Sequence, residues 1–327
     1  MNPSAQAVNI CLQANLPFVL WSDPGKGKDG FLKAIVTALD LLPYCTLSLN
    51  DSDPADIGGL CILSGEWVRR VPVGIVRELF EAKKGTLYLE ELTTSPLSCM
   101  AAALKITHPE PPRRIGDQVL PEEVRIAASA NDPGVAASGR DLPAPSANRV
   151  VHIPWEPTPD EWISGTLQGW PAMHPPQLPE QWWENFRMPA ALETVGFVKC
   201  QPHKLHAMPQ SEDQRGRAWP SQRSWTMWIR LSAAAKALGV GPDVSMILLA
   251  GCIGSGVALE FATWARDLDL PDIEEWIKDP KKVKLPKRAD QVFAAVSGVF
   301  AAIAANLTEP RWLAGWQIVL RLHELGA

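Results

Sequence analysis

The chain has 327 residues, of which 46% are hydrophobic, and it carries a formal net charge of -5 with a pI near 5.7. A chain of this length and composition can bury a large core, so one large domain and a smaller one are the simplest expectation. The acidic balance gives no bulk attraction toward nucleic acid or an anionic membrane, and we expect neither as the main partner.

The cysteines and the first residues indicate a cytoplasmic protein. The six cysteines are scattered without paired spacing, and several lie in apolar runs, as reduced thiols do. The first residues lack the basic start and the continuous apolar run of a signal peptide. The most apolar stretch, residues 244–261, contains glycines and reaches Glu260 too soon to span a bilayer, which takes roughly 20 apolar residues. We expect a buried helix or helix pair there.

Five short runs in the first half have the composition of β-strands. They are PFVLW (17–21), YCTLSL (44–49), GTLYLEEL (85–92), EVRIAASAN (123–131) and RVVHIPW (149–155). Between them, apolar residues recur three and four positions apart in 31–42 and 73–84, which predicts helices. Strands that alternate with helices predict an α/β fold, with a five-stranded, mostly parallel sheet between helices.

The composition changes after Trp155. From residue 156 to about residue 220 the chain is rich in Pro, Trp and polar residues, which predicts a linker ordered by packing around its tryptophans more than by long regular elements. From residue 221 onward, Ala-rich segments with helical spacing predict an all-helical domain. The predicted units are therefore an α/β domain (1–156), a Pro/Trp-rich linker (157–220) and a helical domain (221–327).

The stretch DPGKGKDG, residues 23–30, lies between the first predicted strand and a predicted helix. A phosphate loop needs glycines that let backbone N–H groups approach the phosphates, a lysine for the outer phosphates and a hydroxyl for magnesium. The central glycines and Lys28 fit the pattern G-x-x-x-x-G-K-[ST], whereas Ser22 replaces the first glycine and Asp29 replaces the hydroxyl residue. An ordinary Gly/Pro/Lys turn is the alternative for this stretch taken alone.

Polar side chains also follow the third and fourth predicted strands. Glu90 and Glu91 end the third, where the first acid can hold magnesium and the second can polarise an attacking water. The usual first acid is Asp, so the carboxylate of Glu90 extends one methylene further. Two acids that simply end a buried strand in solvent are the alternative. Asn131 ends the next strand, where its side chain is placed to sense a terminal phosphate or orient water.

Taken in this order, the motifs resemble those of the AAA+ ATPases and, within them, the MoxR-like branch. The matching segments are DPGKGKDGFLKAI for Walker A, SDPADIGGL for a MoxR-type segment, TLYLEELTTSPLSCMAAAL for Walker B, ASANDP for sensor 1, LPAPSANRVVHIPW for the arginine-finger segment and AWPSQRSW for sensor 2. The resemblance covers most of the chain. It implies a P-loop NTPase core of the AAA+ type followed by a helical lid domain.

The resemblance also implies roles for individual residues. The residues implied to bind ATP are Asp23, Pro24, Gly25, Lys26, Gly27, Lys28, Asp29 and Gly30. Those implied to hold Mg²⁺ are Asp29, in place of the hydroxyl residue, and Glu90. Those implied to act in catalysis are Glu91 on the water, Asn131 as sensor 1, Arg223 as sensor 2 and Arg149, which would reach into the site of a neighbouring subunit.

An arginine supplied across an interface implies an oligomer, which in this family is a ring, commonly of six. The resemblance implies a chaperone-like ATP hydrolase that uses ATP and Mg²⁺ to remodel or activate a client, often a protein with a von Willebrand factor A domain. Three departures, Ser22, Asp29 and Glu90, favour slow hydrolysis or purely structural binding. We expect the Cβ of Ser22 to crowd the loop and the charge of Asp29 to repel phosphates. A catalytically degenerate ring subunit that acts as a scaffold, with nucleotide bound or without it, is the alternative. A nucleic-acid motor fits the fold but not the acidic balance.

Two further features fall outside these motifs. The segment CQPHKLH carries Cys200, His203 and His206, a set one ligand short of a structural zinc site, so an irregular segment is the expectation. Residues 111–124, PPRRIGDQVLPEEV, predict a hairpin with Arg113 and Arg114 on one arm. In ring ATPases of this branch such an insertion faces the pore, and a solvated charged hairpin is the alternative.

Overall fold

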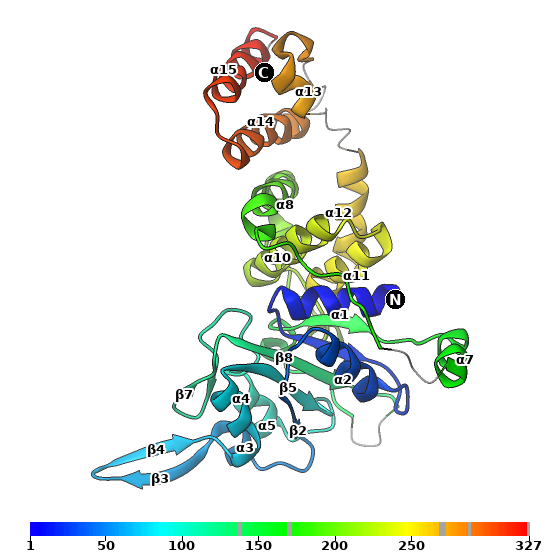
Figure 1. Ribbon diagram of the computed structural model, residues 1–327, viewed down its shortest axis with the longest axis vertical. Coiled ribbons are helices and arrows are strands. Elements are labelled where there is room, and N and C mark those ends of the chain that lie inside the picture. Colours follow the sequence, from blue (N-terminus) through cyan, green and yellow to red (C-terminus); the bar gives the residue numbers. More distant parts are fainter. Residues whose placement is uncertain (136–138, 169–171, 268–272, 285, 287–288, 326–327) are drawn as a thin grey trace.

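The α/β part of the molecule is built on a five-stranded parallel sheet with the strand order β2-β5-β8-β1-β9 (Figure 1). The computed structural model describes residues 1–327 except 136–138, 169–171, 268–272, 285, 287–288 and 326–327. The strands are β1 (Phe18–Trp21), β2 (Tyr44–Ser48), β5 (Lys84–Glu90), β8 (Glu123–Ala130) and β9 (Val151–Pro154). This confirms the predicted α/β fold, and all five strands lie in the predicted runs.

Alternate residues of each strand enter two different cores, one on each face of the sheet. Phe18 and Leu20 of β1 pack on one face under α1 (Pro3–Gln13) and α2 (Lys28–Ala38). Val19 and Trp21 pack on the other face. The short helices there are α3 (Pro54–Gly58), α4 (Arg77–Ala82) with the 3₁₀ turn η1 (Gly74–Val76), α5 (Leu97–Ala103) and α6 (Ala144–Ala147). Burial on both faces explains why these strands are almost continuously apolar.

Four long helices cover the sheet beyond α1 and share its core. They are α8 (Trp182–Cys200), α10 (Gln222–Leu238), α11 (Pro242–Ile253) and α12 (Ser255–Asp267). A Cβ on Gly251 of α11 would lie 2.4 Å from the backbone oxygen of His152, so only glycine allows this close packing of α11 on β9. The apolar stretch 244–261 is therefore a helix pair, as predicted, and no described helix is long and apolar enough to cross a membrane.

The last helices pack around a separate small core (Figure 1). They are α13 (Ile273–Lys278), the 3₁₀ turn η3 (Pro280–Lys282), α14 (Ala289–Ala305) and α15 (Glu309–Glu324). Where α14 lies beside α8, the ammonium group of Lys199 sits 4.0 Å from the ring centroid of Phe293. The division of the chain at residues 156 and 220 stays a prediction.

The segment 157–220 is more regular than the sequence predicted. It contains α7 (Pro159–Gln168), the 19-residue helix α8, the 3₁₀ turn η2 (Pro202–Lys204) and α9 (Glu212–Arg215), while residues 169–171 lie outside the described part. The expectation of few long elements was wrong, because Pro189 inside α8 hid its helical character. Phe197 of α8 is fully buried against Trp225 and Phe261, and this packing stabilises the helix.

Two β-hairpins extend from the core. The predicted hairpin is present as β6 (Arg114–Ile115) and β7 (Gln118–Val119), but Arg113 beside it is only 3% exposed, so this side chain belongs neither to a pore-facing arm nor to a solvated one. The second hairpin, β3 (Leu60–Ser64) and β4 (Trp67–Val71), was not predicted. It projects from the core (Figure 1). Its apolar side chains lie in solvent, with Leu63 79% and Trp67 77% exposed.

Candidate functional site

The loop between β1 and α2 has the backbone of an anion-binding site. Gly25 and Gly27 have φ values of 80° and 73°, and a Cβ on either would meet no atom within 4 Å, so the space over the loop is open. Helix α2 begins at Lys28 without a side-chain cap. The first N–H groups of a helix have no partner within the helix, and together with the helix dipole they attract phosphate. The backbone at Gly25 and Gly27 thus leaves room for the predicted phosphate cradle, which stays a prediction.

The predicted phosphate lysine and the predicted sensor meet at this loop. The ammonium group of Lys28 donates to Oδ1 of Asn131 at 2.8 Å and to the hydroxyl oxygen of Ser22 at 2.9 Å. Partial burial lowers the pKa of Lys28. Ser22 does not adopt a positive φ, so the crowding expected from its Cβ does not occur, because the chain turns at Gly25 and Gly27 instead. Ser22 is a partner of Lys28.

The remaining predicted loop residues lie on the outer side. Asp23, Pro24, Asp29 and Gly30 are exposed, and Lys26 forms an ion pair with Glu156 at 2.9 Å. The hydroxyl of Tyr44 donates to the carboxylate of Asp29 at 3.0 Å.

Three carboxylates converge beside the loop. Glu90 ends β5, Glu91 follows it, and Asp29 lies in the first turn of α2. Burial first, and then the charges of Asp29 and Glu91, raise the pKa of Glu90. The three like charges lie close enough to act on one another, and a hard divalent cation such as Mg²⁺ would offset them through oxygen ligands.

Asn50, which the sequence analysis missed, holds Glu91 in place. Its side-chain amide donates to a carboxylate oxygen of Glu91, and the hydroxyl of Thr94 donates to the same oxygen at 3.1 Å. The hydroxyl of Ser48 donates to Oδ1 of Asn50 at 2.8 Å, which leaves the amide N–H groups facing Glu91. Glu91 has a φ of 56°, an unusual conformation for this residue type. A polar residue directly after the apolar run 44–49 was the only signal of Asn50 in the sequence.

The two predicted arginines lie together at the junction of α6 and α10. Arg149 donates from Nη1 to the oxygen of Leu104 at 3.3 Å, and its buried Nε has no hydrogen-bond partner among the described residues. Arg223 reaches Oδ1 of Asn148 at 3.5 Å. Burial and then the charge of Arg223 lower the pKa of Arg149. Within the described part of the chain, neither guanidinium has a hydrogen bond to the loop or to the three carboxylates.

A different arginine, Arg217, lies over the strand that leads into the loop. Its guanidinium carbon is 3.6 Å from the ring centroid of Trp21, and its Nη2 pairs with the carboxylate of Asp132, next to Asn131. No pattern in the sequence indicated this contact, because Arg217 lies in an irregular segment far along the chain. The structure thus places a cation from the helical half beside the sensor segment.

The residues present fit a magnesium nucleotide better than a protein-held metal. In the described part of the chain, no group of three or more His, Cys, Asp and Glu side chains could hold a metal ion. Magnesium in nucleotide sites needs only one or two carboxylates, because phosphate oxygens and waters complete its shell. The open glycine loop, the uncapped N-terminus of α2 and the three carboxylates suit this arrangement.

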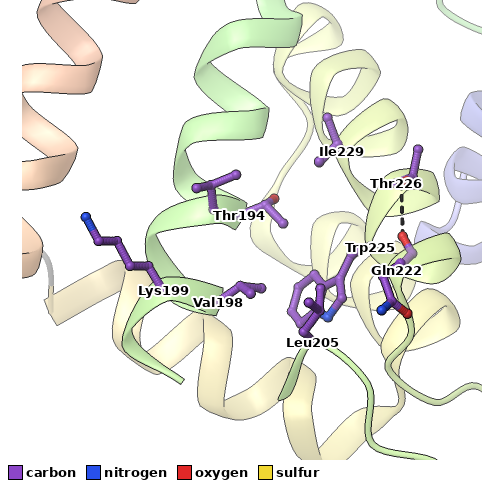
Figure 2. Close-up of a pocket in the computed structure, with 9 residues that line it drawn as sticks. Thr194, Val198, Lys199, Leu205, Gln222, Trp225, Thr226 and Ile229 are labelled. Carbon is purple, nitrogen blue, oxygen red and sulfur yellow. Dashed lines mark hydrogen bonds between the residues drawn. The ribbon is translucent and has the colours of Figure 1, made fainter. Parts of the chain in front are cut away.

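An apolar pocket lies elsewhere in the molecule. A pocket of about 410 Å³ opens between α8 and α10, and none of the predicted site residues lines it (Figure 2). Its wall is mostly apolar, with Trp225 and Val198 facing the space and Lys199 at one side. The functional groups at the carboxyl edge of the sheet therefore lie outside this pocket.

No family model matches the chain, and no curated protein matches it in sequence. Among solved structures, the chain is similar to a protein from Cytophaga hutchinsonii whose crystal structure is provisionally described as that of an ATPase. The TM-score is 0.48 at 14% identity, and the match covers 79% of this chain and 87% of that chain. The strand order, the phosphate loop after β1 and the helical C-terminal region by themselves describe a P-loop NTPase fold of the AAA+ type, an α/β core followed by helices.

Proposed function

We propose that this chain is a MoxR-like AAA+ ATPase that binds ATP with Mg²⁺ and hydrolyses it to remodel or activate a partner protein. One observation carries the proposal. Lys28 and Asn131 meet in front of the uncapped N-terminus of α2, at the same sheet edge as Glu90 and Glu91. Binding of phosphate, neutralisation of its charge and activation of water require these groups together.

Each group has a step that its position supports. The N–H groups of Gly25, Gly27 and the first turn of α2 bind phosphate oxygens, and Lys28 exchanges its bonds to Ser22 and Asn131 for bonds to phosphate. Glu90 would hold Mg²⁺, with Asp29 beside it, and the ion would supply the positive charge that polarises the phosphate. The carboxylate of Glu91 then orients the attacking water and accepts its proton.

The assembly is part of the same proposal. We propose a ring of identical subunits, a hexamer, in which Arg149 leaves the oxygen of Leu104 to reach the neighbouring site while Arg223 acts on the nucleotide of its own subunit. The partner is a client protein or one with a von Willebrand factor A domain. A reducing cytoplasm suits the chain, since no two of its cysteines are joined in the described structure.

A scaffold without hydrolysis is the second candidate, and the contacts of Glu91 favour it. Asn50 and Thr94 both donate to this carboxylate, so a proton-accepting oxygen is already engaged. If these bonds persist when nucleotide binds, the ring binds ATP and does not turn it over.

ATP hydrolysis with Mg²⁺ separates the two candidates. At protein concentrations that favour rings, we expect turnover by the wild type and a loss of at least about 100-fold in Lys28→Ala and Glu91→Gln, the scale of a lost phosphate or base contact. Lys33→Ala is the matched control, because Lys33 is exposed on the same helix outside the loop. Tight ATP binding without turnover, also with a partner present, would support the scaffold. A wild type that binds no nucleotide would reject the ATPase and leave only a scaffold without nucleotide.

A further inference from the structure

Trp155, the residue after β9, packs against the phosphate loop and is hydrogen-bonded to it. Its indole Nε1 donates to the backbone oxygen of Lys26 at 2.9 Å. Its ring stacks on the ring of Phe31 of α2, with centroids 4.0 Å apart, and the side chain is only 5% exposed. Its backbone N–H donates to the oxygen of Trp21 at 2.7 Å. Backbone, ring and indole N–H are thus all fixed, so Trp155 is a rigid donor.

The bond from Trp155 fixes the direction of a second group. The Lys26–Gly27 peptide bond is trans, and in a planar trans peptide the C=O and the next N–H point in opposite directions. Because Trp155 holds the oxygen of Lys26, the N–H of Gly27 points away from Trp155. Gly27 has a φ of 73° and open space around it, so without this bond its peptide plane would be free to rotate.

We propose that Trp155 is a positioning residue that orients the Lys26–Gly27 peptide so that the N–H of Gly27 faces a bound phosphate. The inference rests on the proposed nucleotide binding and adds a residue that does not itself touch the nucleotide. Trp155 acts through the peptide, and the ion pair between Lys26 and Glu156 holds the same segment from the side.

Trp155→Phe tests the role, because phenylalanine keeps an aromatic ring against Phe31 and lacks the indole N–H donor. Trp225→Phe is the matched control. Trp225 is equally buried, at 3% exposure, and its Nε1 also donates to a lysine backbone oxygen at 2.9 Å, that of Lys204. Both changes remove one buried hydrogen bond, so we expect similar losses of thermal stability. Only Trp155→Phe should weaken nucleotide binding.

The measurement is the Kd of ADP with Mg²⁺ by calorimetry, followed by competition with inorganic tripolyphosphate. We expect Trp155→Phe to raise both dissociation constants about 3- to 10-fold, the scale of one neutral hydrogen bond. Trp225→Phe should stay within twofold of the wild type. An effect on ADP but not on tripolyphosphate would mean that Trp155 serves the base, and it would overturn the inference, as would equal effects in the two variants.

Two outcomes separate this inference from the proposed function. A wild type that binds neither ligand refutes nucleotide binding and the role of Trp155 with it. A wild type that binds while Trp155→Phe binds equally well refutes only the role of Trp155. If Trp155→Phe does not fold, Phe31→Leu decides, since it loosens the stacked ring and keeps the donor. Weaker tripolyphosphate binding by Phe31→Leu supports the inference, and unchanged binding overturns it.

Discussion

Charged side chains occupy both edges of the central sheet, but the groups around them differ. At the amino edge, Arg113 is almost fully buried, and its guanidinium donates to the side chain and backbone of Asn15 and to the backbone oxygens of His108, Pro109 and Val124. At the carboxyl edge, Lys28 is half-buried beside neutral oxygens, and the carboxylates of Asp29, Glu90 and Glu91 repel one another.

This difference in hydrogen-bond partners indicates that the charge of Arg113 serves the fold, whereas the charges at the carboxyl edge serve ligand binding. Every donor of Arg113 meets an oxygen of the chain itself, so its bonds exist whenever the protein is folded. The carboxylates of the other edge lower the stability of the empty site and gain from a cation that binds there. We therefore expect changes at the amino edge to alter folding and changes at the carboxyl edge to alter ligand binding.

The largest effect should come from Arg113→Met. The change leaves several buried oxygens without a donor, at about 1–3 kcal/mol for each group that water cannot reach, so we expect the free energy of unfolding to fall by about 3–5 kcal/mol. Burial and the charges of Arg125 and Arg230 lower the pKa of Arg113 to about 10, which leaves it charged near neutral pH. Denaturant unfolding at pH 7 measures the effect.

Arg114→Met is the control for this change, because the neighbouring side chain is exposed. It should alter stability by less than about 0.5 kcal/mol. The comparison between edges fails if Arg113→Met is equally mild, or if it weakens nucleotide binding while the protein stays fully folded.

The next effect concerns His152, which lies within β9 between the two edges. Burial lowers the pKa of His152 to about 4. Nδ1 accepts the indole N–H of Trp21, and Nε2–H donates to the oxygen of Ala147, so both ring nitrogens suit a neutral ring. The unfolded state binds a proton near pH 6.5 and the folded state does not, so the stability is complete above pH 6.5 and falls as the pH drops toward 4.

The expected loss is on the order of 3 kcal/mol between pH 6.5 and pH 4, measured by denaturant unfolding at a series of pH values. His152→Gln should remove most of this pH dependence, because glutamine does not titrate. His323→Gln, an exposed histidine near the end of α15, should leave it in place. A wild type with flat stability over this range would show that His152 is charged or accessible to water.

The motifs of the carboxyl edge could be predicted because parallel strands all end there. A polar residue directly after a buried strand therefore lies at this edge wherever its strand sits in the sheet, and Glu91 after β5 and Asn131 after β8 both follow from that rule. The sheet itself could be predicted from the alternation of strands and helices, because each element is determined by a local pattern of residues.

The partners of these residues could not be predicted, because they come from distant parts of the chain. Asn50 reaches Glu91 only because β2 pairs with β5, and Arg217 reaches Trp21 from an irregular segment. The same limit applies to Arg113, whose charge suggested an exposed hairpin until its contacts with Asn15 showed that it is buried. Sequence patterns predict which functional residues lie at a strand end, and tertiary packing determines which distant side chains contact them.

The smallest expected effect is a gain in ligand affinity, whereas the earlier ones are losses of stability. It tests the carboxylates of the carboxyl edge directly. Asp29→Ser removes one of the three carboxylates and restores the hydroxyl residue usual at this position. Less repulsion of the phosphates should tighten binding of ADP with Mg²⁺ roughly threefold, about 0.6 kcal/mol for one charge at this range in water. The gain should shrink as the salt concentration rises, because salt screens exposed charges. Calorimetry at two ionic strengths measures both.

Asp40→Ser makes the same chemical change at the other edge, where Asp40 pairs with Lys84 at 2.7 Å, and it should leave the Kd unchanged. Weaker binding by Asp29→Ser would mean that Asp29 is itself a ligand of the magnesium ion, whose coordination outweighs the repulsion. In that case the hydroxyl of Tyr44, which donates to Asp29, would orient a metal ligand, and Tyr44→Phe should weaken magnesium-dependent binding as well. Tighter binding by Asp29→Ser would instead show that this carboxylate opposes the ligand.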